Sequence, residues 1–411
     1  MNKRTFVIVG ASLAGAKAAE ELRERGFDGR VVLIGAEPER PYERPPLTKD
    51  YLRGESEREK AYVHPQGWYA EHEIDLETGV TVRELDARGS RVVLDDGGEL
   101  AYDSLLLTTG AEPRRLSVPG ADLEGIYYLR TLADCDALRA RLEDGGRVVV
   151  VGAGWIGSEF AASARQRGLE VTVIDPLALP NQRIFGERVG AFYRDVHVQH
   201  GVEMLLGRGV EAFEGDHAVA RVRTSEGAEV DCDFAVVGVG AVPRTGLART
   251  AGLSVDNGVV VDERLVTSVP NIFAAGDVAS AWHPFYERSI RVEHWANALN
   301  QGPAAARSML GEDVSYERTP YFFSDQYDVG MEYSGYAERW DDVVFRGDPD
   351  GGDGFVAFWL GGGRVLAGMN VNVWDVNEHV QELIRERRVV DPRALADPGT
   401  PLDSLLALSE R

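Results

Sequence analysis

The chain has 411 residues and a mass of 45.0 kDa, which is enough for two or three domains with sizeable cores. Its 44 lysines and arginines face 67 aspartates and glutamates, so the net charge is −23, and this balance argues against direct binding to nucleic acid or to an anionic membrane. No apolar stretch approaches the about 18 residues that span a bilayer. The first strand-like segment begins at Thr5, which leaves no room for a signal peptide, and we expect a cytoplasmic protein.

One pattern occurs twice along the chain. The segments FVIVGASLAGAKAAEELRERG, near the N-terminus, and RVVVVGAGWIGSEFAASARQRG, at 147–168, each contain a β-branched run, a glycine-rich turn and an alanine-rich stretch with helical periodicity. Each is followed by a second strand of the buried type, RVVLIGAE and LEVTVID. Both segments therefore predict a complete βαβ unit.

Such a unit can bind a pyrophosphate at the N-terminus of its helix. A single glycine-rich turn is weak evidence, but two copies in the same strand, turn and helix context argue against accident. An acidic residue ends the second strand of each copy, where a carboxylate can accept hydrogen bonds from ribose hydroxyls. The turn positions and acids are Gly10, Ser12, Gly15 and Glu37 in the first copy, and Gly152, Gly154, Gly157 and Asp175 in the second.

Short antiparallel strands are predicted after each unit. The first group is VTVRELDARGSRVVLDDGGEL, and a comparable meander runs from Val210 to Asp233. Further on, NIFAAGDVAS predicts a strand that ends near Gly276, with Asp277 at the start of a helix. From Thr319 the aromatic and glycine-rich alternation predicts a separate antiparallel sheet, with a hairpin loop at GDPDGGDG and an amphipathic helix at HVQELIRERR.

Neither the cysteines nor the histidines form a recognisable site. Cys135 and Cys232 are far apart, so a Cys-x-x-Cys pair and a disulfide framework are both excluded. His197 and His200 have helical spacing but no third ligand nearby, and we predict no metal site.

Several motifs together resemble one family. GASLAG, PYERPPLTKDYL, LLLTTGAEPR, GAGWIGSEFAA, GVGAVPRTGLA, NIFAAGDVA and VEHWANALNQG are similar to segments of the FAD-dependent pyridine nucleotide-disulfide oxidoreductases, in the family's order. The chain looks most like the NADH-dependent ferredoxin reductases of oxygenase and cytochrome P450 systems. The resemblance implies an α/β fold with two Rossmann-like dinucleotide-binding domains, as in glutathione reductase, and a C-terminal α+β interface domain. Its domain boundaries would be 1–112 with 246–318 for FAD, 113–245 for NADH, and 319–411 for the interface domain.

The resemblance also implies which residues bind the two cofactors. The first copy departs from the glycine pattern at Ser12, whose hydroxyl could itself reach a phosphate. The residues matching FAD-contacting positions are Gly10, Ser12, Ala14, Gly15, Glu37, Arg44, Lys49, Val82, Thr109, Gly110, Arg130, Asp277 and Trp295. Those matching NADH-contacting positions are Gly152, Gly154, Ile156, Gly157, Asp175 and Gly240.

Lys49 and Glu159 match the family's catalytic pair beside the flavin. There the lysine can orient the ring and favour its reduced form, while the glutamate holds the lysine and meets the nicotinamide. Without the motifs, Lys49 would read as a surface lysine and Glu159 as a solvated helix carboxylate.

The disulfide reductases, NADH oxidases and coenzyme A disulfide reductases of this superfamily need a cysteine at the flavin. RPPLTKDYLRGE contains none, so we expect electrons to leave singly, to a [2Fe–2S] ferredoxin that supplies a cytochrome P450 or a dioxygenase. The alternatives are a rubredoxin or quinone reductase, and an NADH-responsive interaction protein of the apoptosis-inducing-factor type.

Asp175 predicts a preference for NADH, because its charge repels a 2′-phosphate, although Arg183 stands nearby. Phe323 stands where some relatives have a tryptophan at the flavin, which puts an electron route through an indole in doubt. An acidic ferredoxin would need a local basic patch to dock. The candidates for that patch are Arg288, Arg291, Arg307, Arg318 and Arg339, which read equally well as scattered solvated arginines.

Overall fold

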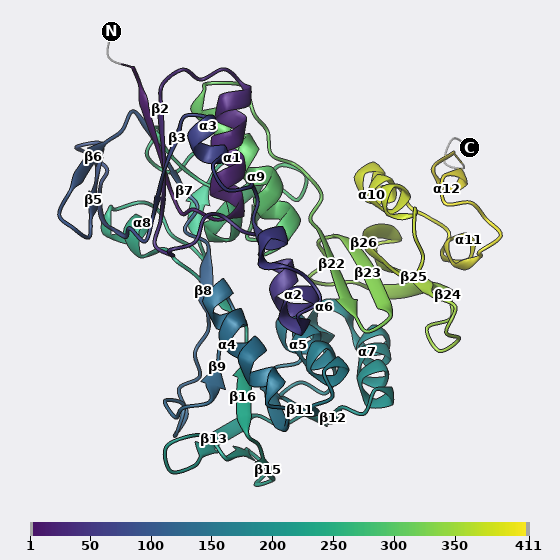
Figure 1. The fold of residues 1–411 in the computed structure, drawn as a ribbon. Helices are drawn as coiled ribbons and strands as arrows, with labels where there is room; N and C mark the ends of the chain where they lie inside the picture. The colour runs from purple at the N-terminus through teal and green to yellow at the C-terminus, as the bar shows by residue number, and fades with distance from the viewer. Residues whose placement is uncertain (1–2, 408–411) are drawn as a thin grey trace. The chain divides into compact units, whose positions relative to one another are not determined.

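The computed structural model describes residues 3–407, which form two compact units (Figure 1). The first unit takes in residues up to 45, 57–112 and 241–318; the second takes in 46–56, 113–240 and the residues from 319 onward. The division into three domains drawn from the resemblance stays a prediction. Among the described residues, no helix is both long and apolar enough to cross a bilayer.

A five-stranded parallel sheet forms the centre of the first unit, in the order β19-β7-β1-β2-β3. Strand β1 is buried at every position from Phe6 to Val9, as expected for a parallel strand covered on both faces. The bounds are β1 (Thr5–Val9), β2 (Arg30–Gly35), β3 (Ile74–Thr78), β7 (Ser104–Leu107) and β19 (Ile272–Ala274).

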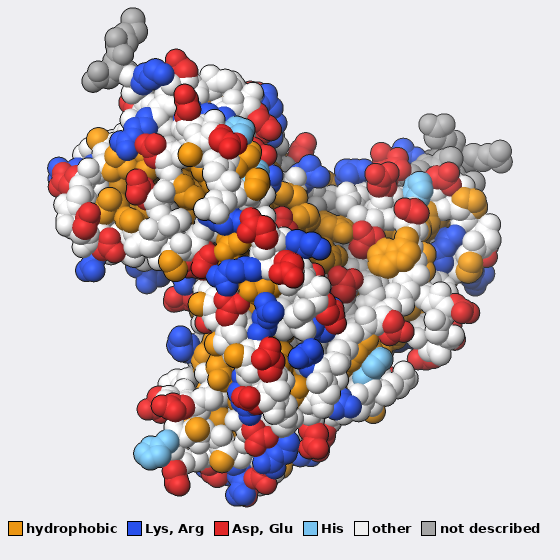
Figure 2. Space-filling view, in the orientation of Figure 1, with side chains coloured by type: hydrophobic (Ala, Val, Ile, Leu, Met, Phe, Trp, Pro, Cys, Tyr) orange, Lys and Arg blue, Asp and Glu red, His pale blue; other side chains and the backbone are white. Residues whose placement is uncertain are grey.

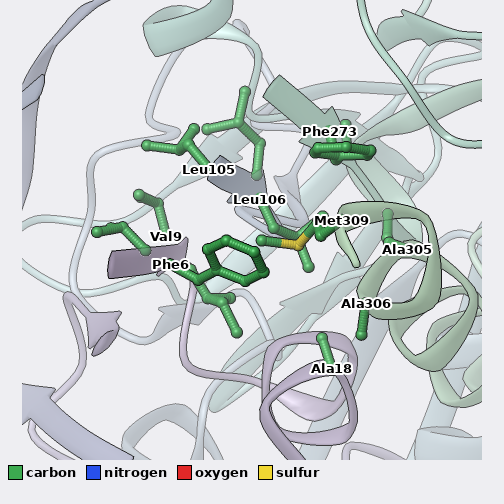
Figure 3. Close-up of a cluster of buried hydrophobic side chains, with 14 of the residues drawn as sticks. Phe6, Val9, Ala18, Leu105, Leu106, Phe273, Ala305, Ala306 and Met309 are labelled. Atoms are coloured by element: carbon green, nitrogen blue, oxygen red, sulfur yellow. The ribbon is translucent and has the colours of Figure 1, made fainter. Parts of the chain in front are cut away.

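Helices α1 (Leu13–Glu24) and α9 (Trp295–Met309) pack against each other through small residues. A Cβ atom at Gly302 of α9 would lie 2.3 Å from the carbonyl oxygen of Ala14 in α1, so only glycine allows this approach. Figure 3 shows Phe6, Leu106 and Phe273 of the sheet meeting Met309 in one apolar cluster. The core of the first unit therefore joins the first βαβ unit to α9, which lies nearly 300 residues later.

The remaining elements of the first unit are short. They are β4 (Val82–Asp86), β5 (Arg91–Leu94), β6 (Glu99–Ala101), β18 (Val259–Val261), β20 (Ala279–His283), β21 (Arg288–Ile290), α3 (Trp68–Glu71), α8 (Gly246–Thr250) and the 3₁₀ turns η2 (Arg58–Ala61) and η3 (Gly276–Val278). The expected helix at Asp277 was wrong: η3 is one 3₁₀ turn, and β20 follows directly. The next long helix, α9, begins only at Trp295.

The second unit contains a parallel sheet of the same kind, in the order β12-β11-β10-β16-β9. The predicted strand, turn, helix and strand are present in both copies of the repeated pattern. The bounds are β9 (Ile126–Tyr127), β10 (Arg147–Val151), β11 (Glu170–Asp175), β12 (Glu203–Leu206), β16 (Phe234–Val237), α4 (Leu132–Glu143), α5 (Trp155–Gln166), α6 (Gln182–Phe185) and α7 (Glu187–Gln199). The predicted meander is β13 (Val210–Glu214), β14 (Arg221–Thr224) and β15 (Glu229–Asp231).

A five-stranded antiparallel sheet follows, as the composition predicts, in the order β22-β23-β26-β25-β24. Trp359 of this sheet is fully buried against α6, where its indole N–H donates to the Phe185 carbonyl at 3.1 Å. The bounds are β22 (Tyr321–Gln326), β23 (Val329–Gly335), β24 (Asp342–Gly347), β25 (Phe355–Gly361), β26 (Arg364–Val371), α10 (Asn377–Glu386), α11 (Pro392–Ala396) and α12 (Ser404–Ala407). The hairpin loop between β24 and β25 and the amphipathic helix α10 are confirmed.

Four short elements complete the described part of the chain. Strands β8 (Ala111–Pro113) and β17 (Ala241–Pro243) pair with each other, and the 3₁₀ turn η1 (Pro45–Thr48) precedes α2 (Asp50–Arg53). Residues 46–56 belong to the second unit, which places Lys49 together with the second βαβ unit.

Candidate functional site

The turn after β1 has the backbone that a pyrophosphate-binding loop requires. Gly10 has φ +123°, and a Cβ atom there would lie 2.1 Å from the carbonyl oxygen of Thr108. A Cβ atom at Gly15 would lie 2.2 Å from the carbonyl oxygen of Gly10, so α1 begins close to the strand only because this residue is glycine. The first N–H groups of α1 therefore remain available to an anion.

A polar cluster stands beside this turn. The Arg44 guanidinium donates to the Ser12 hydroxyl and lies 3.6 Å from the Glu37 carboxylate, which also accepts from the Tyr42 hydroxyl at 2.5 Å. Ser12 precedes α1 and Glu37 follows β2, and the Arg44 guanidinium lies near both side chains. At the carboxyl ends of strands β1 and β2, the cluster thus offers a cation for a phosphate and a carboxylate for a ribose.

Asp277 lies on η3, next to the start of α9. Burial lowers the pKa of His294 to about 4, and the charge of Asp277 opposes that shift. The N–H of Gly276 donates to the side-chain oxygen of Gln301 at 2.9 Å, which ties η3 to α9. Burial raises the pKa of Glu43, against a hydrogen bond from the side chain of Trp295.

The other matched positions of the first unit have defined places. Ala14 lies in α1, and Val82 begins β4. Thr109 and Gly110 follow β7, where the Thr109 hydroxyl donates to the Arg244 carbonyl at 2.9 Å. All matched FAD positions except Lys49 and Arg130 therefore belong to the first unit.

The turn after β10 repeats the first geometry. Gly152 has φ +105°, and a Cβ atom at Gly157 would lie 1.9 Å from the carbonyl oxygen of Gly152. Gly154 caps α5 and has open space around a Cβ position, and Ile156 is 37% exposed, unusually for a large apolar side chain at a helix start. Gly240 follows β16 and accepts from the N–H of Arg114 at 2.9 Å.

Asp175 ends β11, half-buried beside this turn. Its two carboxylate oxygens accept from the backbone N–H groups of Ala153 and Leu177, both at 2.7 Å. Arg183 is exposed on α6. The acid is therefore fixed against the glycine-rich turn.

Lys49 and Glu159 form a buried ion pair within the second unit. The Lys49 ammonium lies 2.7 Å from Oε2 of Glu159, with 13% and 9% of the two side chains exposed. Glu159 lies on α5, two residues after Gly157, and Lys49 caps α2. Neither residue is the solvated surface charge that it would be without the motif context.

Two hydroxyls that the sequence analysis missed complete the coordination of Glu159. Thr48 donates to Oε2 at 2.5 Å, and Ser324 donates to Oε1 at 2.7 Å. Three donors thus surround one buried carboxylate. Ser324 was detectable as a polar residue that follows three aromatic ones on a strand, but its distance of 165 residues from Glu159 hid the pairing.

Phe323 lies beside Lys49, and Arg130 also belongs to the second unit. The Lys49 ammonium is 5.4 Å from the centre of the Phe323 ring, which is within the range of a cation–π contact. Arg130 precedes α4, and its backbone N–H donates to the Asp134 carboxylate at 3.1 Å.

Both cysteines are buried and separate. The Cys135 thiol donates to the Leu47 carbonyl at 3.3 Å, and burial raises the pKa of the Cys232 thiol to about 12. Burial keeps both sulfurs away from the solvent, where thiol exchange would take place.

Two of the arginines proposed for docking lie beside acidic side chains. Arg291 is paired with Glu293, and Arg307 lies 3.8 Å from Glu21. Arg318 and Arg339 are exposed, in the first and second units respectively, and Arg288 is exposed on β21. On the face that Figure 2 shows, acidic and basic side chains are interspersed.

Two family models together match most of the chain. Residues 4–302 match the model described as pyridine nucleotide-disulphide oxidoreductase, and residues 321–406 match the model described as reductase C-terminal.

Full-length relatives are similar over nearly the whole sequence. The chain is 42% identical over 410 residues to the ferredoxin–NAD(+) reductase component of the anthranilate 1,2-dioxygenase system of Burkholderia cepacia, covering 99% of this chain and 100% of that protein. It is 36% identical to putidaredoxin reductase of Pseudomonas putida, covering 98% and 97%. A crystal structure of the covalent putidaredoxin reductase–putidaredoxin complex matches with a TM-score of 0.95, at 36% identity and with full coverage of both chains.

Proposed function

The chain belongs to the pyridine nucleotide-disulphide oxidoreductase family, and from this premise we propose that it oxidises NADH and reduces a [2Fe–2S] ferredoxin that supplies a cytochrome P450 or a dioxygenase. It is an oxidoreductase whose cofactors are FAD and NADH. Relatives that cover the same length carry the name of ferredoxin reductase. When bound, FAD supplies the conversion between a two-electron hydride donor and a one-electron acceptor.

The observation that carries the proposal is the lack of a usable sulfur in a chain with two dinucleotide-binding turns. The sequence contains two cysteines, and both are buried in structural positions. A relay of electron pairs through a disulfide or a thiolate is therefore excluded. A one-electron protein acceptor fits this constraint better than the disulfide and peroxide substrates of related enzymes.

The first unit fits FAD. Its Gly10–Gly15 turn leaves room for a pyrophosphate, Arg44 and Ser12 offer donors beside it, and Glu37 is positioned for ribose hydroxyls. We assign the ribityl chain to Asp277, the adenine to the backbone of Val82, and the flavin to Trp295. Ala14, Thr109, Gly110, Arg44 and Arg130 complete the proposed FAD contacts.

The second unit fits NADH. Gly152, Gly154 and Gly157 form its turn, with Ile156 and Gly240 beside it, and Asp175 places a negative charge where NADPH would carry a 2′-phosphate. We propose that Lys49 orients the flavin and that Glu159 holds Lys49 and meets the nicotinamide. The protein would act in the cytoplasm, where NADH is supplied.

Anaerobic stopped-flow mixing tests this function. Mixing with NADH should bleach the flavin absorbance rapidly, and a second mixing with oxidised [2Fe–2S] ferredoxin should restore it. Restoration only by rubredoxin or by a quinone would replace the proposed acceptor. Slow bleaching, with a persistent long-wavelength band and a change of oligomeric state, would instead indicate an NADH-responsive interaction protein.

A further inference from the structure

Strand β22 carries two polar side chains where its buried face should be apolar. Phe322, Ser324 and Gln326 alternate on this face, and Ser324 and Gln326 are each only 1% exposed. Burying a polar group costs free energy unless it is hydrogen-bonded. The partners of these two side chains therefore indicate why the strand retains them.

The hydrogen bonds run in one direction, because Glu159 can only accept. Ser324 uses its one proton on Oε1 of Glu159, at 2.7 Å. Its oxygen must then accept from Gln326, whose side-chain nitrogen is 3.2 Å away. The amide oxygen of Gln326 consequently faces Nε2 of His197 at 2.9 Å, so this ring nitrogen must carry the proton.

His197 continues the chain in the same direction. Burial lowers the pKa of His197 to about 4, so the ring is neutral at pH 7 and its Nδ1 is an acceptor. The hydroxyl of Tyr327 lies 3.3 Å from Nδ1 and can donate to it. His200, which follows the last residue of α7, stacks on the ring of Tyr327, with the two ring centroids 3.7 Å apart.

The two oxygens of Glu159 thus have separate partners. Oε1 accepts from Ser324, at the end of the chain, while Oε2 accepts from Lys49 and Thr48. Hydrogen bonds that point the same way polarise one another, so this series of hydrogen bonds strengthens the last one, from Ser324 to the carboxylate. Without Ser324, the carboxylate could rotate about its Cγ–Cδ bond, and the position of Lys49 would no longer be fixed.

We propose that Ser324, Gln326 and His197 are positioning residues for hydride transfer, and that they act by fixing the orientation of Glu159 through this one-directional hydrogen-bond chain. The inference rests on the proposed function, because it gives Glu159 and Lys49 their role toward NADH and FAD. It assigns the C-terminal sheet a part in the reaction that does not depend on where the electron acceptor docks.

The imidazole ¹⁵N spectrum of the unaltered protein tests the direction of these hydrogen bonds without any turnover. His197 should appear as the neutral Nε2–H tautomer from pH 8 down to pH 6. A spectrum with the proton on Nδ1, or a ring that protonates above pH 6, would overturn the proposal. This result does not require any variant to fold.

Single-turnover reduction of FAD by NADH tests the consequence. Ser324→Ala should lower the limiting rate of flavin reduction about tenfold, the effect of one hydrogen bond to a charged group, while the Kd for NADH stays within twofold. Ser324→Thr should restore the rate. The matched control is Ser334→Ala on the neighbouring strand β23, which removes a buried hydroxyl that donates to Asn377 at 2.7 Å.

The two proposals fail in different ways. If the unaltered protein does not transfer hydride from NADH to FAD, the proposed function fails. If it does, but Ser324→Ala matches the unaltered protein or is slowed no more than Ser334→Ala, the proposed function survives and the positioning role is wrong.

Discussion

The carboxylate of Asp175 accepts a hydrogen bond from the backbone N–H of Ala153 at 2.7 Å. The acid that ends β11 is thereby fixed to the middle of the glycine-rich turn in the same βαβ unit. An ionised carboxylate has about four acceptor sites, so the two backbone bonds leave capacity for ribose hydroxyls. If the nicotinamide cofactor binds this turn as we propose, the same charge would repel a 2′-phosphate.

Replacement of Asp175 should therefore change the preference between the two nicotinamide cofactors. In Asp175→Ser we expect kcat/KM with NADH to fall about tenfold and kcat/KM with NADPH to rise, because a hydrogen-bond acceptor and a repulsive charge are both lost. Steady-state kinetics with both cofactors measure the ratio. Asp216→Ser, at an exposed loop position, is the control. An unchanged ratio would mean that another group, such as Arg183, sets the preference.

Gly15→Ala should impair FAD binding. The added Cβ atom would lie 2.2 Å from the carbonyl oxygen of Gly10 and 3.1 Å from a methyl group of Leu33, so the turn has to move. The ratio of flavin to protein absorbance after purification should fall severalfold. Gly246→Ala adds a Cβ atom with nothing within 4 Å, and it should keep its FAD. A fully loaded Gly15→Ala protein would show that the close approach is not needed.

The Lys49–Glu159 pair should behave as one unit in stability. Removal of either partner leaves the other as a buried, uncompensated charge, which costs about 3 kcal/mol, so Lys49→Met and Glu159→Gln should each lower Tm. The decrease in Tm of the double variant should be smaller than the sum of the decreases of the two single variants. Differential scanning calorimetry of all four proteins gives the comparison. Strict additivity would show that the pair is not coupled.

Burial of His197 predicts acid sensitivity. Its pKa is lowered by burial from 6.5 to about 4, so between these values the unfolded chain binds a proton that the folded protein does not. This contribution to stability is complete above pH 6.5 and is lost as the pH falls toward 4. From pH 7 to pH 5, one such histidine lowers the free energy of unfolding by about 2 kcal/mol.

The difference in Tm between pH 7 and pH 5 checks this sign. The difference should be smaller in His197→Gln than in the unaltered protein, although His294, whose pKa is also lowered to about 4 by burial, keeps part of it. His217→Gln removes an exposed histidine and should leave the difference unchanged. An equal difference in His197→Gln would contradict the assignment.

The sequence predicted what depends on local periodicity and turn chemistry. Both βαβ units, the two meanders and the C-terminal sheet follow from strand patterns and glycine positions, since each is encoded within one continuous stretch of the sequence. Asp277 was misassigned to a helix because a Gly-Asp pair after a strand also suits a single 3₁₀ turn. Local sequence does not separate these two outcomes.

Long-range partners could not be predicted in this way. Glu159 and Lys49 were paired only through the resemblance to a family, and Ser324 and Thr48 were missed, because contacts between residues 110 to 165 positions apart leave no local pattern. The sequence shows that both residues are polar, but a buried polar residue indicates only that it has a hydrogen-bond partner, not which residue that partner is.

We propose NADH as the electron donor and a [2Fe–2S] ferredoxin as the acceptor. The most direct measurement is cytochrome c reduction by the purified, FAD-loaded protein, with and without an added [2Fe–2S] ferredoxin, using NADH and NADPH in turn. We expect strong stimulation by ferredoxin with NADH and little activity with NADPH. Equal rates with and without each ferredoxin tested, despite rapid flavin reduction by NADH, would contradict it.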